Sequence, residues 1–98
     1  MNLDPTQGSE IRKTRPAVVL TADALNRARR TVVVVPLSTG PTPQPPIVLQ
    51  IPSAGDGAVA VCDQIRAVDR RRLTRRIGML AAADLRAVEN GVRAVLEL

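Results

Sequence analysis

Apolar residues along this chain gather in short runs that polar, proline-containing or glycine-containing segments separate. Runs of this length, rich in valine and bounded by turn residues, are typical of β-strands rather than of helices. Residues 31–37 are nearly all valine, which predicts a strand that is buried on both faces. The expected strands cover residues 15–20, 31–37, 47–51, 58–65 and 75–80.

The C-terminal segment has a different spacing, in which apolar residues recur every three or four positions. This period predicts a helix over residues 81–97, with one apolar and one charged face. Gly91 lies inside the helix, where glycine costs about 1 kcal/mol relative to alanine, so it either permits close packing or is tolerated. The residues expected on the apolar face are Leu85, Val88, Val92 and Val95.

The segments between these elements predict turns and loops. Residues 40–46 contain four prolines, which lack the donors that a sheet needs, so a surface loop is expected there. Residues 55–57 mark a turn, residues 1–14 a loop, and residues 21–26 and 69–73 helical turns. Short antiparallel strands before a terminal helix predict a single, mainly β domain that forms a small open barrel.

Composition limits both the core and the partners. The chain has 98 residues, 45% of them apolar, but no Phe, Tyr or Trp, so aliphatic side chains have to build the core. So small a domain buries a modest fraction of its surface, and dimerisation would bury more. The net charge of +5 predicts an anionic partner, either nucleic acid or an acidic peptide. Nearly all positive charge is arginine, which suits phosphate binding but is also expected from a GC-rich genome.

The residue types that are absent exclude several kinds of chemistry. There is no histidine, and therefore no His general base, His-ligated zinc or Ser-His-Asp triad. Cys62 is the only cysteine, which excludes an intrachain disulfide and a Cys-rich metal site, and we expect it to be a small buried hydrophobe. The lone cysteine, with no signal peptide or long apolar segment, favours a cytoplasmic protein without membrane spans, metal or cofactor.

The junction at Arg15 and Pro16 is the most informative point of the sequence. A polar segment, residues 8–14, ends in basic residues and runs directly into an apolar strand. A residue before proline is extended, and proline is tolerated at the start of a strand. Arg15 is therefore expected at the mouth of a strand, where a guanidinium can bind a phosphate. The alternative is a surface arginine that pairs with Glu10 or Asp63.

This segment resembles the MazF/PemK family of toxin endoribonucleases, in which a strand opens with a similar loop–Arg–Pro–apolar pattern. The resemblance continues in order through residues 31–38, 63–69, 72–73 and 76–80 and into the C-terminal helix. It implies an SH3-like antiparallel barrel of the CcdB/PemK type and a homodimer. It also implies a sequence-specific, metal-independent ribonuclease that cuts single-stranded mRNA and is inhibited by a MazE-like antitoxin with an acidic tail, in a type II toxin–antitoxin system.

The resemblance also implies two catalytic residues. Without metal or histidine, the ribose 2′-hydroxyl can attack its own phosphate to leave a 2′,3′-cyclic phosphate, and the protein aligns the atoms and stabilises charge. Arg15 matches the family's catalytic arginine, and Ser38 matches its second catalytic position. The sequence alone favours a turn-forming role for Ser38, and Thr39 is an alternative to it.

Further candidates lie at the end of the fourth strand and after it. Asp63 and Gln64 match a pair near the family's RNA groove, and Asp63 either orients an arginine or serves as a structural clasp. The arginines within residues 66–76 predict a phosphate track for single-stranded RNA, or a solvated face. Some relatives have an arginine where this chain has Val61, so Arg15 is expected to act more nearly alone. The candidates for RNA binding or site support are Lys13, Thr14, Thr39, Asp63, Gln64, Arg66, Arg70 and Arg72.

The start of the chain departs from the family pattern. In the family, a strand with a Gly-Asp pair and an aromatic residue precedes the loop, and residues 1–5 resemble only the end of such a strand. A missing barrel strand would expose a sheet edge and apolar surface. Two other interpretations therefore stay open: an inactive relic of a ribonuclease, and a non-enzymatic CcdB-like toxin that binds DNA gyrase. The Arg-Pro and Asp-Gln pairs favour the ribonuclease.

Overall fold

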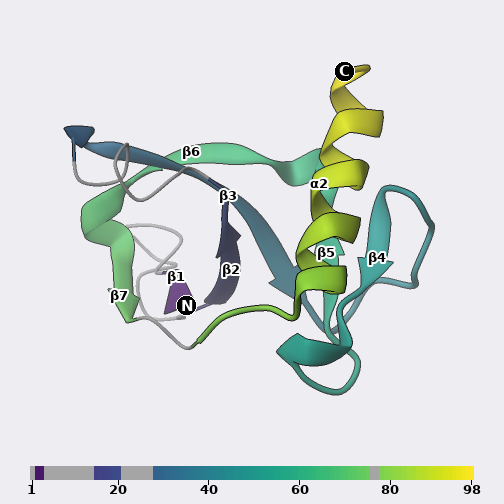
Figure 1. Cartoon of the computed structure of the whole chain (residues 1–98). Helices are drawn as coiled ribbons and strands as arrows, with labels where there is room; N and C mark the ends of the chain where they lie inside the picture. Colours follow the sequence, from purple (N-terminus) through teal and green to yellow (C-terminus); the bar gives the residue numbers. More distant parts are fainter. Residues whose placement is uncertain (1, 4–14, 21–27, 76–77) are drawn as a thin grey trace.

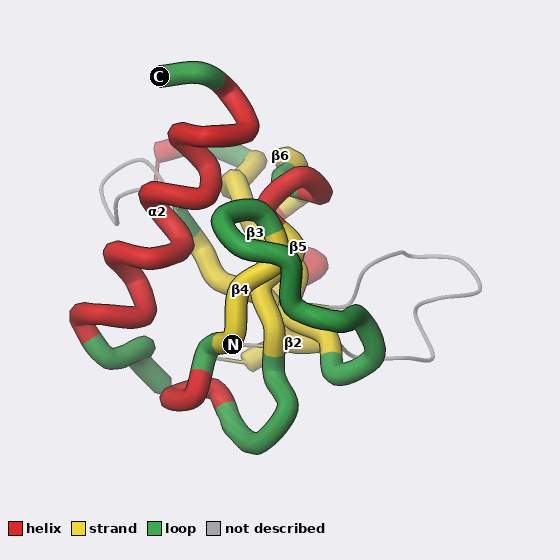
Figure 2. Tube along the Cα trace, turned by 90° about the vertical axis from the view of Figure 1, so that its right-hand side faces the viewer, coloured by secondary structure: helices red, strands yellow, loops and turns green. Residues whose placement is uncertain are grey.

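The computed structural model describes residues 2–3, 15–20, 28–75 and 78–98. They form a coiled antiparallel sheet with the helix α2 (Ala82–Leu96) alongside it (Figures 1 and 2). The strands are β1 (Asn2–Leu3), β2 (Arg15–Val19), β3 (Thr31–Ser38), β4 (Val48–Gln50), β5 (Val59–Val61), β6 (Arg66–Asp69) and β7 (Leu73–Arg75). Short 3₁₀ turns are η2 (Pro52–Ala54), η3 (Cys62–Gln64) and η4 (Arg70–Arg72).

Strand β3 organises the sheet because it pairs with three other strands. Along one edge lies β2, with Ala17 opposite Pro36 and Val19 opposite Val34. Along the other edge, β6 pairs with the first half of β3, and β5 pairs with its last two residues. Beyond them, β4 extends the sheet from β5, and β1 links β2 to β7. This is the mainly β, small antiparallel barrel with a C-terminal helix that the sequence predicts.

The central strand carries core residues on both faces, as the valine run predicts. One apolar cluster lies between the sheet and α2, and it includes Val35 and Leu37 of β3 and Val88 of the helix. The other cluster contains Val32 and Val34 of β3. Its other members are Ala17 and Val68, with Val19 and Leu73 packed against them. Alternate residues of one extended strand thus bury against two separate layers.

Helix α2 packs closely at Gly91 against η3, β4 and the loop before β4. A Cβ atom there would lie 2.6 Å from Cys62 Sγ and 2.7 Å from the Pro46 carbonyl oxygen, so only glycine fits without a shift. This confirms close packing as the reason for a helix-breaking residue inside a helix. Cys62 is fully buried, as expected. Burial raises the pKa of its thiol, and the negative charge of Asp63 raises this pKa further.

The helix begins without a capping side chain of its own, because its N-cap residue is Ala81. Ser53, in η2, supplies the missing partner from another part of the chain. Its hydroxyl accepts a hydrogen bond from the Ala81 N–H at 3.0 Å and donates one to the Asp84 carboxylate. The Ser53 N–H also donates to Asp84, at 2.9 Å. These bonds fix the first turn of α2 to the turn that follows β4.

Most expected elements are found, with three corrections. The expected strand 58–65 is broken, because Cys62–Gln64 forms η3 and turns the chain from β5 toward β6. The expected strand 75–80 lies earlier, at Leu73–Arg75, where β1 provides a partner, and residues 78–80 are not in a strand. Leu85 is 36% exposed rather than buried, since its turn lies beside η2 and not over the sheet.

The expected turns are found where the structure describes them, but residues 2–3 of the loop expected at 1–14 form β1, because β2 and β7 provide partners for them. Residues 40–46 form the exposed loop before β4, and Gly57 has the positive φ of 73° that favours glycine in a turn. The helical turn expected at 69–73 is η4, capped by the Asp69 carboxylate. Residues 1, 4–14 and 21–26 lie outside the described residues. Among the helices of the described part, none is both long and apolar enough to cross a membrane.

Candidate nucleic-acid interface

Arg15 and Ser38 lie at the same end of the antiparallel pair formed by β2 and β3. Arg15 opens β2, and Ser38 closes β3. The paired residues of the two strands end at Ala17 and Pro36, so each candidate lies two positions beyond the last paired residue of its strand. The fold thus brings two candidates that lie more than twenty positions apart in the sequence to the same end of the sheet.

The Arg15 guanidinium is available to bind a ligand. Its side chain is exposed, and within the described residues it has no hydrogen-bond or ion-pair partner. The alternative of an ion pair with Asp63 is therefore not found, and Glu10 lies outside the described residues. Lys13 and Thr14, the neighbouring candidates, also lie outside them. An exposed guanidinium can present its N–H groups to a phosphate in a bidentate contact.

The Ser38 hydroxyl is half-buried at the end of β3. It accepts a hydrogen bond from the Gly40 N–H at 3.3 Å, which is the turn-forming interaction that the sequence alone favoured. A hydroxyl that accepts one bond still has its own proton and a second lone pair. The turn therefore holds Ser38 in place without using up its capacity to bind a ligand.

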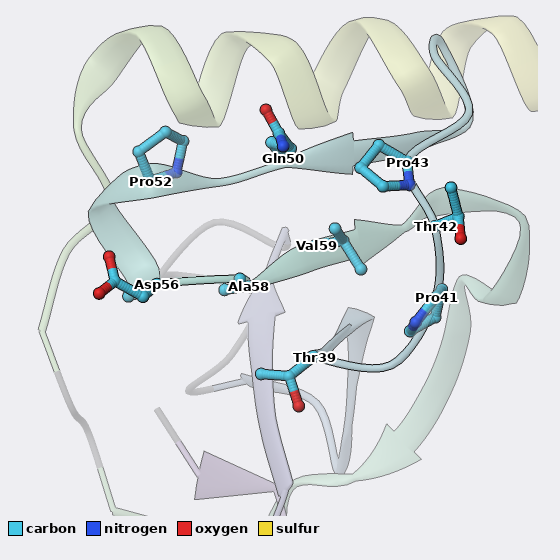
Figure 3. A pocket seen from close by; sticks show the side chains of 11 residues that line it. Thr39, Pro41, Thr42, Pro43, Gln50, Pro52, Asp56, Ala58 and Val59 are labelled. Carbon is cyan, nitrogen blue, oxygen red and sulfur yellow. The ribbon is translucent and has the colours of Figure 1, made fainter.

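An open hollow of about 510 Å³ begins beside Ser38. Val59, which pairs with Ser38, lines it, and so does Thr39. Figure 3 shows Thr39 and the segment 41–43 on one side, the turn with Asp56 on the other, and Gln50 beside Val59 between them. Its volume is in the range of small-molecule sites. Hydroxyl, amide and carboxylate groups along its wall can donate and accept hydrogen bonds.

Asp63 and Gln64 lie elsewhere, at the corner between β5 and β6. Both are exposed in η3, and the next strand begins with the exposed Arg66, which pairs with Val34 in the middle of β3. This corner is therefore displaced along β3 from Ser38 by about four residues, or about 13 Å. The structure places Arg15, Ser38 and Thr39 at one end of the β2–β3 pair, and it places the Asp-Gln pair nearer to Arg66.

The arginine-rich turn η4 is organised by Asp69. This carboxylate accepts a hydrogen bond from the Arg71 N–H at 2.8 Å and two from the Arg71 guanidinium, at 3.1 and 2.9 Å. The bonds from the Arg71 side chain, and then the one from its backbone, hold the pKa of Asp69 at about 2. Asp69 is thus ionised but paired. Arg70 is exposed and Arg72 half-buried in the same turn.

Two features of the surface were not predicted from the sequence. Gln50, in the hollow, belongs to a strand that the apolar pattern located without showing which face it lines. Arg29 and Arg30 come just before β3, and the Arg70 N–H donates to the Arg30 carbonyl at 2.7 Å. The charge of these residues is visible in the sequence, but their closeness to η4 depends on the pairing of β3 with β6.

Among the described residues, no three His, Cys, Asp or Glu side chains gather to hold a metal ion.

Comparison with known proteins shows the family to which the chain belongs. Residues 1–96 match the family model of the PemK-like, MazF-like toxins of type II toxin–antitoxin systems. The chain is 31% identical to the endoribonuclease MazF9 of Mycobacterium tuberculosis, over all of this chain and 91% of the relative. It is 36% identical to the endoribonuclease PemK of Escherichia coli, over 72% of this chain and 56% of the relative.

The fold itself has solved counterparts. A MazE–MazF structure from Deinococcus radiodurans superposes with a TM-score of 0.79, at 24% identity, over all of this chain and 90% of the counterpart. At this identity the likeness concerns the fold alone. It agrees with the barrel-like sheet and terminal helix described above.

Proposed function

Because the chain belongs to the PemK-like, MazF-like toxin family of type II toxin–antitoxin systems, we propose that it is a sequence-specific endoribonuclease that cuts single-stranded mRNA without a metal ion. The observation that carries the proposal is the pair formed by Arg15 and Ser38. An exposed guanidinium without a partner among the described residues lies at the same end of the β2–β3 pair as a hydroxyl. A relative that the chain covers over 91% of its length, and that is named an endoribonuclease, supports it.

The proposed reaction is an internal transfer within the RNA. The 2′-oxygen forms a bond to the phosphorus, the bond from phosphorus to the 5′-oxygen breaks, and a 2′,3′-cyclic phosphate and a 5′-hydroxyl result. The 2′-hydroxyl proton passes to water, and water returns a proton to the departing 5′-oxygen. Arg15 stabilises the extra negative charge of the phosphorane, and Ser38 donates a hydrogen bond to the phosphate.

The residues present suit charge stabilisation better than proton transfer. An arginine stays protonated at all ordinary pH values, so Arg15 cannot act as a general base. The chain has no histidine to take that role. The proposed enzyme is therefore slow, and its contribution to the rate comes from positioning and from the fixed positive charge.

Sequence specificity is assigned to the hollow beside Ser38. A base that follows or precedes the cut could enter it and meet the polar groups of Thr39, Gln50 and Asp56. Single-stranded RNA is usually read by hydrogen bonds to such splayed bases. Because the chain has no aromatic residue for stacking, hydrogen bonds have to supply most of the discrimination.

We further propose a homodimer that an antitoxin with an acidic tail inhibits. The small size and the aliphatic core support dimerisation, as argued from composition. The charge of +5 supports binding of an acidic tail, which would compete with RNA for the arginines. The exposed Asp63, Gln64 and Arg66 at the β5–β6 corner are the candidates to support the RNA or the tail.

End-group analysis of the products tests the proposed reaction. The purified protein is incubated in EDTA with a long unstructured RNA, and the fragment ends are mapped. We expect discrete cuts with 2′,3′-cyclic phosphate and 5′-hydroxyl ends, and loss of one cut when its 2′-hydroxyl is replaced by hydrogen. A requirement for added Mg²⁺, or 3′-hydroxyl ends, would contradict the mechanism. A folded protein that cuts no RNA would instead point to a toxin that acts by binding, or to an inactive relic.

A further inference from the structure

Four arginines gather at the end of β3 that is remote from Ser38. We define the basic corner as Arg29, Arg30, Arg70 and Arg71. Arg29 and Arg30 come just before β3, whose first residue, Thr31, pairs with Asp69. The hydrogen bond of 2.7 Å from the Arg70 N–H to the Arg30 carbonyl joins the two segments directly. All four side chains are exposed.

The one acidic group within these two segments, Asp69, is already paired. Its carboxylate forms an ion pair of 2.9 Å with Arg71, whose side chain remains 85% exposed. Arg30 also lies close enough to lower the pKa of Asp69 through its charge. Asp69 therefore holds the corner together. The segments 29–30 and 69–72 contain five arginines and one aspartate, a formal charge of +4.

The basic corner lies far from the proposed site of cleavage. Thr31 and Ser38 are the first and last residues of β3, at most about 24 Å apart along the strand. A single RNA strand that reaches both ends of β3 therefore spans several nucleotides. The exposed Arg66 lies between the two ends, opposite Val34 in the middle of β3.

We propose that the basic corner is a second RNA-binding site, which holds the phosphate backbone of the substrate several nucleotides away from the cut. The proposal rests on the proposed function, since it assumes an RNA substrate. It adds a site that acts on affinity for long RNA and takes no part in the chemistry. Phosphate contacts of this kind position a nucleic acid without reading its sequence.

RNA fits the corner better than an acidic protein does. Specific protein interfaces are built around buried apolar or aromatic anchors. The large exposed apolar side chains of the described residues are Met79, Leu85, Leu96 and Leu98, and none of them belongs to the two segments of the corner. The exposed arginines of these two segments suit a ligand whose affinity comes from regularly spaced phosphates.

A charge-matched pair of variants tests the second site. Arg29→Gln/Arg30→Gln removes two charges from the corner, and Arg86→Gln/Arg93→Gln removes two from exposed positions of α2. Affinity is measured by fluorescence anisotropy with a 2′-O-methyl RNA of about 40 nucleotides, which lacks the attacking hydroxyl and stays intact. Thermal unfolding shows whether each variant is folded. The hydrogen bond from the Arg70 N–H to the Arg30 carbonyl joins backbone atoms only, so the Arg30→Gln substitution does not remove it.

We expect the corner variant to bind the long RNA roughly tenfold more weakly at moderate salt, and the α2 variant to bind like the parent. The slope of log K against log salt should fall by about 1.4, because two phosphate contacts are lost. Equal affinity and slope in the corner variant and the parent would overturn the proposal. So would unchanged RNA binding together with lost binding of polyglutamate, which would make the corner a site for acidic protein.

The binding measurement is independent of catalysis. If the parent binds the long RNA through the corner but cuts no RNA, the proposed function fails and the second site stands. If the parent cuts RNA and the corner variant binds like the parent, the second site fails and the proposed function stands. If the parent does not bind the long RNA at all, the second site is refuted directly.

Discussion

At the scale of single residues, the proposed chemistry depends on Arg15 and on the hydroxyl of Ser38. The Arg-Pro junction predicts an extended arginine at a strand mouth, and the structure places it there. The sequence could not show that Ser38 lies at the same end of the sheet, because that requires the antiparallel pairing of β2 with β3. The sequence also could not distinguish a turn-forming Ser38 from a catalytic one. In the structure, the Ser38 hydroxyl forms the turn and still has its proton and a second lone pair for a ligand.

Ser38→Ala should slow cleavage by about tenfold, because one hydrogen bond to the phosphate is lost and the arginine remains. The unfolding temperature should change little, since the bond from the Gly40 N–H is exposed. Single-turnover cleavage of one RNA measures the rate. Ser38→Thr, which keeps the hydroxyl, serves as the control and should retain most of the activity. An alanine variant as fast as the parent would remove Ser38 from the mechanism.

Cys62 should be inert in the folded protein. It is fully buried under Gly91, and burial raises the pKa of its thiol, so both access and the reactive thiolate are scarce. We expect labelling by a thiol reagent to be at least about 100-fold slower in native buffer than in denaturant. Comparable rates in the two conditions would show that the contact between α2 and the sheet opens readily.

At the scale of elements, the valine run and the helical period were sufficient to predict β3 and α2 within one residue or two at each end. The sequence failed where the chain turns a corner. Residues 58–62 are continuously apolar and Ile65 follows two polar residues, yet β5 ends at Val61, because the next strand has to pair with the other half of β3. The length of β5 is set by the strand with which it pairs, and a local sequence pattern does not identify that partner.

Gly91→Ala should destabilise the fold although alanine is the better helix former. The added methyl would lie 2.6 Å from Cys62 Sγ and 2.7 Å from the Pro46 carbonyl, and the backbone atom cannot move aside easily. Crowding of about 2–3 kcal/mol, less about 1 kcal/mol of helix propensity, leaves a net loss of about 1–2 kcal/mol. Urea unfolding measures it. Gly78→Ala, where nothing lies within 4 Å of the new atom, is the control and should leave stability nearly unchanged.

The bonds between Ser53 and α2 should stabilise the start of the helix. Ser53→Ala removes the acceptor for the Ala81 N–H and one donor to Asp84, for an expected loss of about 1 kcal/mol. A double-mutant cycle with Asp84→Ala, followed by urea unfolding, isolates the interaction. Strictly additive losses would show that the two side chains do not act together.

At the scale of the whole molecule, the basic corner and the proposed cutting site are separated along β3. Arg15, Ser38 and the hollow lie at one end, and the basic corner at the other. The sequence gives the charge of +5 and the arginine clusters, but only the pairing of β3 with β6 brings Arg30 beside η4. A long, flexible anion suits such a surface, in agreement with a toxin that acts on RNA.

The most direct test of the central claim is the cleavage rate of three proteins in EDTA: the parent, Arg15→Ala and Arg86→Ala. Each replaced arginine is exposed, so each variant should fold and lose one charge. We predict that Arg15→Ala loses at least about 100-fold of the single-turnover rate, and that Arg86→Ala stays within about twofold of the parent. Cleavage by Arg15→Ala at the rate of the parent would contradict the assignment of this arginine as the catalytic residue.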